Sequence, residues 1–79
     1  MNNQEKLSSV ITGILGVDAK ELQDHKKVGD IPNWDSFNNL QIIAAVEDAF
    51  NVHFTTDEIL AATHYQDVKD LLRKHGVQL

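Results

Sequence analysis

Cysteine is absent from this chain of 79 residues. The chain therefore has no disulfide framework and no thiolate that could bind a metal or attack a substrate. It also lacks an apolar run long enough to span a membrane. Its first residues, Met1 to Glu5, do not resemble a signal peptide. We therefore expect a cytoplasmic protein without a membrane partner.

Positive charge is missing from the middle of the chain. Residues 28–68 contain no lysine or arginine, and the whole chain carries a net charge of −5. The acidic residues of this segment are Asp30, Asp35, Glu47, Asp48, Asp57, Glu58 and Asp67. Such a negative field repels nucleic acid and attracts a basic protein surface. Charge thus argues against a nucleic-acid partner and leaves a basic protein partner and a merely solubilising surface as alternatives.

The residue sets that carry catalysis or bind metals are also absent. The histidines stand alone, without the three- or four-residue spacing of metal ligands: His25, His53, His64 and His75. Ser36 has no recognisable base and orienting acid around it, as a hydrolase requires. The glycines Gly13 and Gly16 do not form a phosphate-binding loop, because no Gly-Lys-Ser/Thr sequence follows them. We predict no catalytic residues and no metal site, and hence a protein that is not an enzyme.

Length and periodicity predict one all-α domain over residues 1–79, which we expect to be monomeric. A chain of this size buries only about 60% of the surface that its unfolded form exposes, which leaves little room for a deep cleft. We predict a four-helix bundle of three longer helices and one short helix, without strands. A long structured loop, residues 17–34, should connect the first two helices.

The first helix and the long loop have clear local signals. Apolar residues follow a helical spacing from Leu7 to Leu15, Asn2 with Glu5 can cap the start, and Gly16 can end the helix in a left-handed conformation. A single helical turn is predicted around residues 18–21. The side chains expected to fix the loop onto the helices are Val17, Leu22, Val28, Ile31 and Trp34.

The second helix should span residues 36–50, with Asp35 or Ser36 as its N-cap. Its core side is predicted to hold Asn39, Ile42, Ile43, Val46, Ala49 and Phe50. Its opposite side should hold Phe37, Gln41, Ala44 and Asp48. An exposed Phe37 would suit a partner contact, whereas a tilted first turn would pack it against the loop instead.

Two capping signals mark the remaining helices. Thr55 with Glu58 predicts a capping box for a short third helix that contains Ile59 and Leu60. Thr63 with Gln66 offers a second box for the last helix, which Gly76 can terminate. The apolar face of this helix comprises Tyr65, Val68, Leu71 and Leu72.

Together these features resemble the acyl carrier protein family over nearly the whole chain, from Leu7 to Leu72. The specific part is Trp34-Asp35-Ser36-Phe37, followed by the apolar spacing of the second helix. In that family the matching serine carries a prosthetic group. The resemblance therefore implies that Ser36 bears 4′-phosphopantetheine, attached as a phosphodiester, and that Trp34, Asp35 and Phe37 mark the helix start. An anion at a helix N-terminus is electrostatically favourable.

The resemblance also implies a thioester carrier whose thiol comes from the attached group. The implied partners are a phosphopantetheinyl transferase, an acyl- or aminoacyl-loading enzyme, and a downstream synthase or transferase. Partner recognition is assigned to Phe37, Gln41, Ala44, Glu47, Asp48, Asp57 and Glu58. The candidate residues of an acyl pocket are Leu40, Ile43, Val46, Ile59 and Leu60, although for any one of them an ordinary core position is the favoured interpretation.

The chain departs from the family pattern after the serine. Phe37 stands where leucine is usual, and the early turns of the helix, often acidic in fatty-acid carriers, contain the amides Asn38, Asn39 and Gln41. These departures favour a specialised pathway, such as polyketide, peptide or modified-sugar assembly, over housekeeping fatty-acid synthesis. The alternative is an unmodified acidic adaptor that binds a basic partner through the second helix. A serine hydrolase is the least favoured interpretation.

Overall fold

The computed structural model describes residues 2–79, and every regular element in that range is helical. The elements are α1 (Asn3–Leu15), the 3-10 turn η1 (Ala19–Glu21), α2 (Ser36–Phe50), α3 (Thr56–Ala61) and α4 (Tyr65–Lys74). This confirms the prediction of an all-α chain with three longer helices, one short helix and a long connection before the second helix. The single turn predicted around residues 18–21 corresponds to η1.

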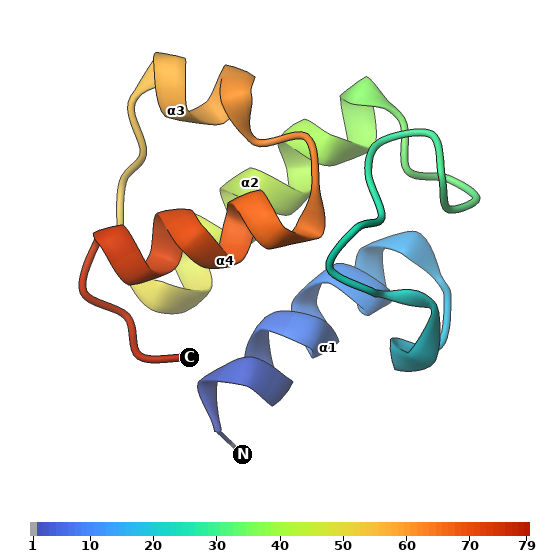
Figure 1. Cartoon of the computed structure of the whole chain (residues 1–79), viewed down its shortest axis with the longest axis horizontal. Helices are drawn as coiled ribbons and strands as arrows, with labels where there is room; N and C mark the ends of the chain where they lie inside the picture. Colours follow the sequence, from blue (N-terminus) through green and yellow to red (C-terminus); the bar gives the residue numbers. More distant parts are fainter. Residues whose placement is uncertain (1) are drawn as a thin grey trace.

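The core lies where α1, α2 and α4 meet (Figure 1). These helices contribute the buried side chains Leu7, Ile11, Leu15, Ile42, Ile43, Val46, Tyr65, Val68 and Leu72. The short α3 lies at the edge of the bundle and contributes no fully buried residue. The two ends of the chain lie close together, and the Asn3 amide donates a 2.9 Å hydrogen bond to the backbone carbonyl of Gln78.

Local capping chemistry sets the ends of the helices, as the sequence predicts. The Asn2 side chain accepts a 2.8 Å hydrogen bond from the backbone N–H of Glu5, and Gly16 ends α1 with a φ of 71°. At α3, the Thr55 hydroxyl accepts from the N–H of Glu58 at 3.1 Å, while the Glu58 carboxylate accepts from the N–H of Thr55 at 2.8 Å. This reciprocal pair is the predicted capping box.

The connection between α1 and α2 is held by both packing and backbone hydrogen bonds. Leu22, Ile31 and Trp34 are buried, as predicted, whereas Val17 and Val28 are half-buried. The N–H of Val28 donates to the carbonyl of Thr63 at 3.0 Å. Further along, the N–H of Tyr65 donates to the carbonyl of Lys26 at 2.9 Å. The connection is therefore tied to the start of α4 and forms an ordered side of the domain.

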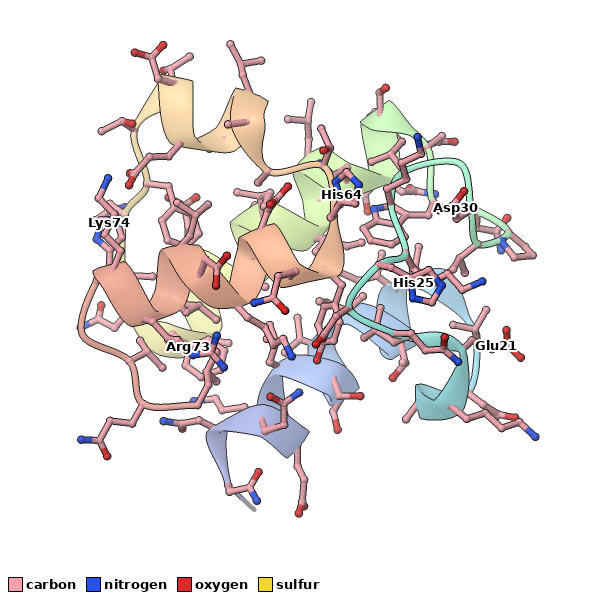
Figure 2. All side chains as sticks on the ribbon, in the orientation of Figure 1. Glu21, His25, Asp30, His64, Arg73 and Lys74 are labelled. Carbon is pink, nitrogen blue, oxygen red and sulfur yellow. The ribbon has the colours of Figure 1, made fainter. Side chains whose placement is uncertain are left out.

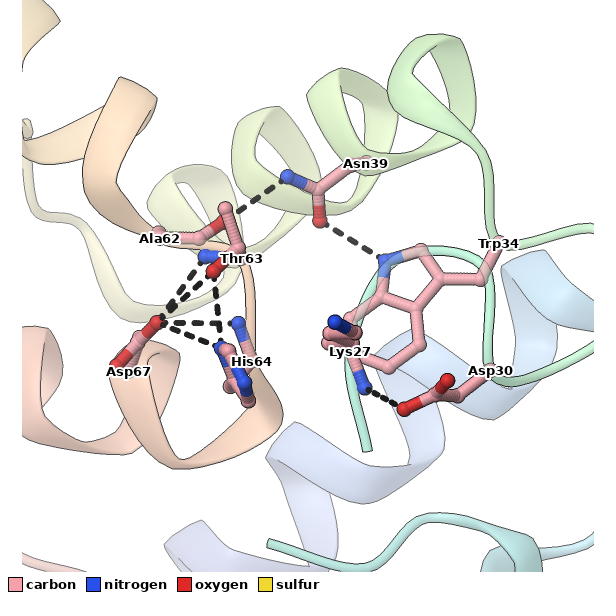
Figure 3. A network of polar contacts seen from close by, with 8 residues as sticks. All are labelled: Lys27, Asp30, Trp34, Asn39, Ala62, Thr63, His64 and Asp67. Atoms are coloured by element: carbon pink, nitrogen blue, oxygen red, sulfur yellow. Dashed lines mark hydrogen bonds and ion pairs between the residues drawn. The ribbon is translucent and has the colours of Figure 1, made fainter. Parts of the chain in front are cut away.

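The start of α4 requires a correction. The predicted box of Thr63 and Gln66 is wrong, because His64 is the N-cap and the Asp67 carboxylate accepts from the N–H groups of Thr63 and His64, both at 3.1 Å (Figure 3). The Gln66 amide instead donates to Asp70 at 2.9 Å. An ionised carboxylate is a stronger acceptor than an amide. The Thr63 carbonyl also accepts from the N–H of Val28 in the long connection, and the helix begins only at Tyr65.

Candidate functional site

Asp35, not Ser36, is the N-cap of α2. Its backbone is extended, with a φ of −109°, and its carboxylate accepts a 2.8 Å hydrogen bond from the N–H of Asn38. Ser36 is therefore the first helical residue, and it is exposed. Because the cap is supplied by Asp35, the serine hydroxyl is left on the surface at the positive end of the helix dipole.

A buried pair of hydrogen bonds stabilises the same helix start. The Trp34 indole, only 2% exposed, donates from Nε1 to the Asn39 side-chain oxygen at 2.9 Å (Figure 3). The Asn39 amide nitrogen donates in turn to the carbonyl of Ala62 at 3.1 Å. One buried amide thus connects the long loop, α2 and the segment between α3 and α4. The helical spacing placed Asn39 on the core side of α2, but neither of these bonds was predictable from local sequence.

Ser36 borders a mostly apolar pocket of about 270 Å³. The residues that line it are Val28, Ser36, Asn39, Leu40, Ile59, Leu60, Ala62 and Thr63. Three of the five residues assigned to an acyl pocket, Leu40, Ile59 and Leu60, therefore lie there. Sequence reasoning missed Val28, Ala62 and Thr63 because they come from separate segments that only the fold brings together.

Ile43 and Val46, the other two residues assigned to an acyl pocket, are not among the residues that line this one. They are 1% and 0% exposed and belong to the core cluster. The two residues continue the buried stripe of α2 beyond Asn39, at helical spacings of four and seven. The pocket therefore ends near the first turns of α2 and does not extend along the helix.

The predicted recognition residues divide into two groups. Phe37 is 70% exposed, which excludes the alternative that it packs against the long loop. The other exposed recognition residues are Gln41, Ala44, Asp48 and Asp57, and with Phe37 they form the first group.

Two leucines that line the pocket beside Ser36 are also exposed: Leu40 is 56% exposed and Leu60 is 71% exposed. We call these two side chains, together with that of Phe37, the apolar rim.

Glu47 and Glu58 form the second group, because their carboxylates also make contacts within the fold. The Glu47 carboxylate accepts a 2.8 Å hydrogen bond from the N–H of Phe54, which holds the segment after α2. The Glu58 carboxylate lies 3.0 Å from Lys74 Nζ and 3.2 Å from His75 Nε2. Figure 2 shows Lys74 at the end of α4, on the side that faces α3. Both glutamates are occupied in holding the fold together.

The contacts of Glu58 give a testable dependence on pH. The backbone hydrogen bond from Thr55, followed by the contact with Lys74, lowers the pKa of Glu58 from 4.5 to about 2. A carboxyl whose pKa is lower in the folded state stabilises the fold above its unfolded pKa and loses this effect as the pH falls through its folded pKa. For Glu58→Gln we therefore expect a lower Tm than wild type above pH 4.5, with a difference that shrinks toward pH 2. Thermal unfolding followed by circular dichroism across this range measures the effect.

The exposed neighbour Asp57 provides the matched control for this experiment. Asp57→Asn removes the same charge from the same helix without breaking the contacts to Lys74 and His75. A pH-independent difference between Glu58→Gln and wild type would contradict the assignment of these contacts as a stabilising ion-pair cluster.

Within residues 2–79, no group of three histidine, aspartate or glutamate side chains lies close enough together to hold a metal ion. None of the helices described in this range combines the length and the apolarity needed to cross a membrane.

Comparison with known proteins identifies several acyl carrier proteins that are similar to this chain over most of its length. The chain is 30% identical to the acyl carrier protein of Solidesulfovibrio magneticus over 74 residues, which cover 94% of this chain and 95% of that protein. It is 27% identical to the acyl carrier protein of Clostridium acetobutylicum, over 90% of this chain and 92% of that protein. The acyl carrier protein of Buchnera aphidicola is 26% identical, over 94% of this chain and 95% of that protein. No protein-family model matches the chain.

Proposed function

The chain belongs to the acyl carrier protein family, and on this premise we propose that residues 1–79 form one carrier domain whose attachment site is Ser36. Proteins of this family are carriers and not catalysts, in agreement with the prediction that the chain is not an enzyme. The observation that carries the assignment is the position of an exposed serine at the first residue of α2, beside an apolar pocket. The proposed cofactor is 4′-phosphopantetheine.

The residues at the start of α2 fit a phosphodiester. The first N–H groups of a helix have no acceptor within the helix, so the N–H groups of Ser36 and Phe37 are available to an acceptor outside it. These groups and the helix dipole favour an anion at this position. The Asp35 carboxylate is already bonded to the N–H of Asn38 and does not occupy the serine hydroxyl.

The attached group would supply the thiol that this cysteine-free chain lacks. The residues of the chain have the other roles. Ser36 provides the attachment oxygen, and its exposure gives a transferase access to that oxygen. The pocket lined by Leu40, Ile59 and Leu60 provides an apolar site beside it, where an acyl or aminoacyl cargo would be shielded from water.

We place this carrier in a specialised pathway, such as polyketide, peptide or modified-sugar assembly. Amides occupy the early turns of α2, where Asn38 and Asn39 take part in hydrogen bonds within the fold. Docking of partners at this end would therefore depend more on the apolar rim than on acidic side chains. The proposed partners are a phosphopantetheinyl transferase, an acyl- or aminoacyl-loading enzyme, and a synthase or transferase that accepts the cargo.

The apolar rim and the exposed acids of α2 should both contribute to transferase docking. For Phe37→Ala we expect a loss of roughly tenfold in kcat/KM for phosphopantetheinylation, because large exposed aromatic side chains are favoured among the few interface residues whose truncation costs more than about 1 kcal/mol. For Asp48→Lys we expect a smaller loss that decreases as the salt concentration is raised. Steady-state kinetics with one transferase at two ionic strengths measure both effects.

Asp18→Lys is the control for the charge reversal, because Asp18 is an exposed acid in the long connection, far along the chain from Ser36. An equal loss for Asp18→Lys and Asp48→Lys would show that only the total charge matters and would contradict docking through α2.

The proposed function is tested by the intact mass of the protein after incubation with coenzyme A and a promiscuous phosphopantetheinyl transferase. We expect the mass to increase by one phosphopantetheine. A folded protein that gains no mass, while a control carrier is modified in parallel, would favour the alternative adaptor. The adaptor would use the exposed Phe37 and the acidic surface without any modification of Ser36.

A further inference from the structure

We propose that Asn39 is a gate that restricts the pocket beside Ser36 to short acyl groups. This inference rests on the carrier function proposed above and adds the size class of the cargo. It is based on the buried hydrogen bonds of Asn39, on the volume of the pocket and on the burial of the residues that follow Asn39 on the same face of α2.

Asn39 lies between the attachment point and the core. It comes three residues after Ser36 and four residues before Ile43, so the three side chains follow one another along one side of the helix. At about 1.5 Å per residue, Ile43 lies roughly 6 Å beyond Asn39 along the helix axis. A chain that extends from Ser36 along α2 must therefore pass Asn39 before it reaches the apolar side chains of the core.

The Asn39 side chain closes this route. Its amide nitrogen donates to the carbonyl of Ala62, which lies across the pocket at the end of α3 (Figure 3). Its oxygen is held by the Trp34 indole, so the amide is fixed from both sides. Asn39 is only 8% exposed, and therefore water cannot easily replace either partner when a bond breaks.

The space on the outer side of this gate suits a short chain. The pocket measures about 270 Å³, whereas a closed cavity of about 150 Å³ is known to hold the six carbons of benzene, so we expect the pocket to hold a chain of about eight carbons. Beyond the gate, Ile43 and Val46 are 1% and 0% exposed, so no further space is preformed there. A longer cargo must displace the Asn39 amide from Ala62 in order to bury its remaining methylenes.

The relative magnitudes favour a closed gate for chains of moderate length. The cargo is either buried in the pocket or exposed to water. Each methylene that it buries shifts the equilibrium between these two forms roughly fourfold toward the buried form. Opening the gate leaves two buried polar groups without partners, the Asn39 amide nitrogen and the Ala62 carbonyl. The usual cost of this loss is offset by the burial of about five additional methylenes. An octanoyl group should fit outside the gate, and the four additional methylenes of a dodecanoyl group should not be enough to open it.

The experiment compares the shielding of two thioesters. Wild-type protein is loaded from octanoyl- or dodecanoyl-coenzyme A, and loading is verified by intact mass. The rate of thioester cleavage by hydroxylamine is then measured relative to the matching free acyl-pantetheine. We expect dodecanoyl and octanoyl to be shielded to within tenfold of each other. An open pocket would instead shield dodecanoyl by roughly two orders of magnitude more.

Two variants test whether Asn39 sets this limit. Asn39→Ala should raise the ratio of dodecanoyl to octanoyl shielding by at least tenfold, because both bonds and the blocking side chain are lost. Trp34→Phe keeps the aromatic bulk but removes the donor to Asn39, and it should raise the ratio in the same direction by a smaller factor. Gln23→Ala is the control, because its exposed amide lies outside the pocket and away from the surface assigned to partner recognition.

The outcomes separate this inference from the carrier function. Absence of mass gain in the first step would overturn the carrier function and, with it, the gate. Normal loading, with dodecanoyl shielded by roughly two orders of magnitude more than octanoyl in the wild type, would overturn the gate alone. Similar shielding of the two thioesters in the wild type that remains similar in folded Asn39→Ala and Trp34→Phe proteins would also overturn the gate, because another feature would then limit the pocket.

Discussion

Ser36→Ala should abolish phosphopantetheine loading and leave the fold intact. The substitution removes the attachment oxygen, so we expect the intact mass to stay at that of the unmodified protein even after prolonged incubation with coenzyme A and transferase. The free energy of unfolding should change by no more than about 0.5 kcal/mol, because Asp35 caps α2 and alanine is the best helix former. Mass spectrometry and urea unfolding measure the two effects.

Ser9→Ala is the matched control for this experiment. The chain contains only two other serines, Ser8 and Ser9, and Ser9 is an exposed residue of α1. Loading of Ser9→Ala should equal that of wild type. Full loading of a folded Ser36→Ala protein would assign the modification to a different residue and overturn the proposed site.

Among the substitutions described, Trp34→Ala should cause the largest decrease in the free energy of unfolding. The side chain is 2% exposed, and truncation of a buried aromatic residue typically costs about 3–5 kcal/mol. It also leaves the oxygen of Asn39 without its indole donor. The total stability expected for a chain of 79 residues is roughly 4–12 kcal/mol, so this single change removes a large part of it. Urea unfolding followed by far-UV circular dichroism measures the loss.

Phe37→Ala is the control for Trp34→Ala, because it removes an aromatic side chain that is exposed and not buried. Phe37 lies three residues after Trp34 and is 70% exposed, so its truncation should change the free energy of unfolding by no more than about 0.5 kcal/mol. Similar losses for Trp34→Ala and Phe37→Ala would contradict the assignment of Trp34 as a core residue of the long connection. Trp34 is the only tryptophan of the chain, so the Trp34→Ala protein cannot be followed by tryptophan fluorescence.

The local part of the fold was predictable because its signals act over a few residues. Asn2, Asp35 and Thr55 each accept a hydrogen bond from a backbone N–H three residues later, and this spacing can be recognised in the sequence. The apolar periodicity of α1 and α2 likewise predicted their buried faces. The same local reasoning failed at α4, where the long connection fixes the backbone of Thr63 and shifts the start of the helix.

The sequence by itself determined the helical class of the chain, the approximate position of α2 and the exposure of Ser36, because these features follow from helical periodicity and neighbouring caps. The structure decided that Asp35 is the N-cap of α2 and that Phe37 is exposed. Tertiary structure alone decided which residues form the pocket and which hold the fold. Asn39 meets Ala62 across 23 positions, and Glu58 meets His75 across 17. Contacts over such separations depend on how the helices pack against one another. That packing buried Ile43 and Val46 and directed Glu47 and Glu58 into the fold.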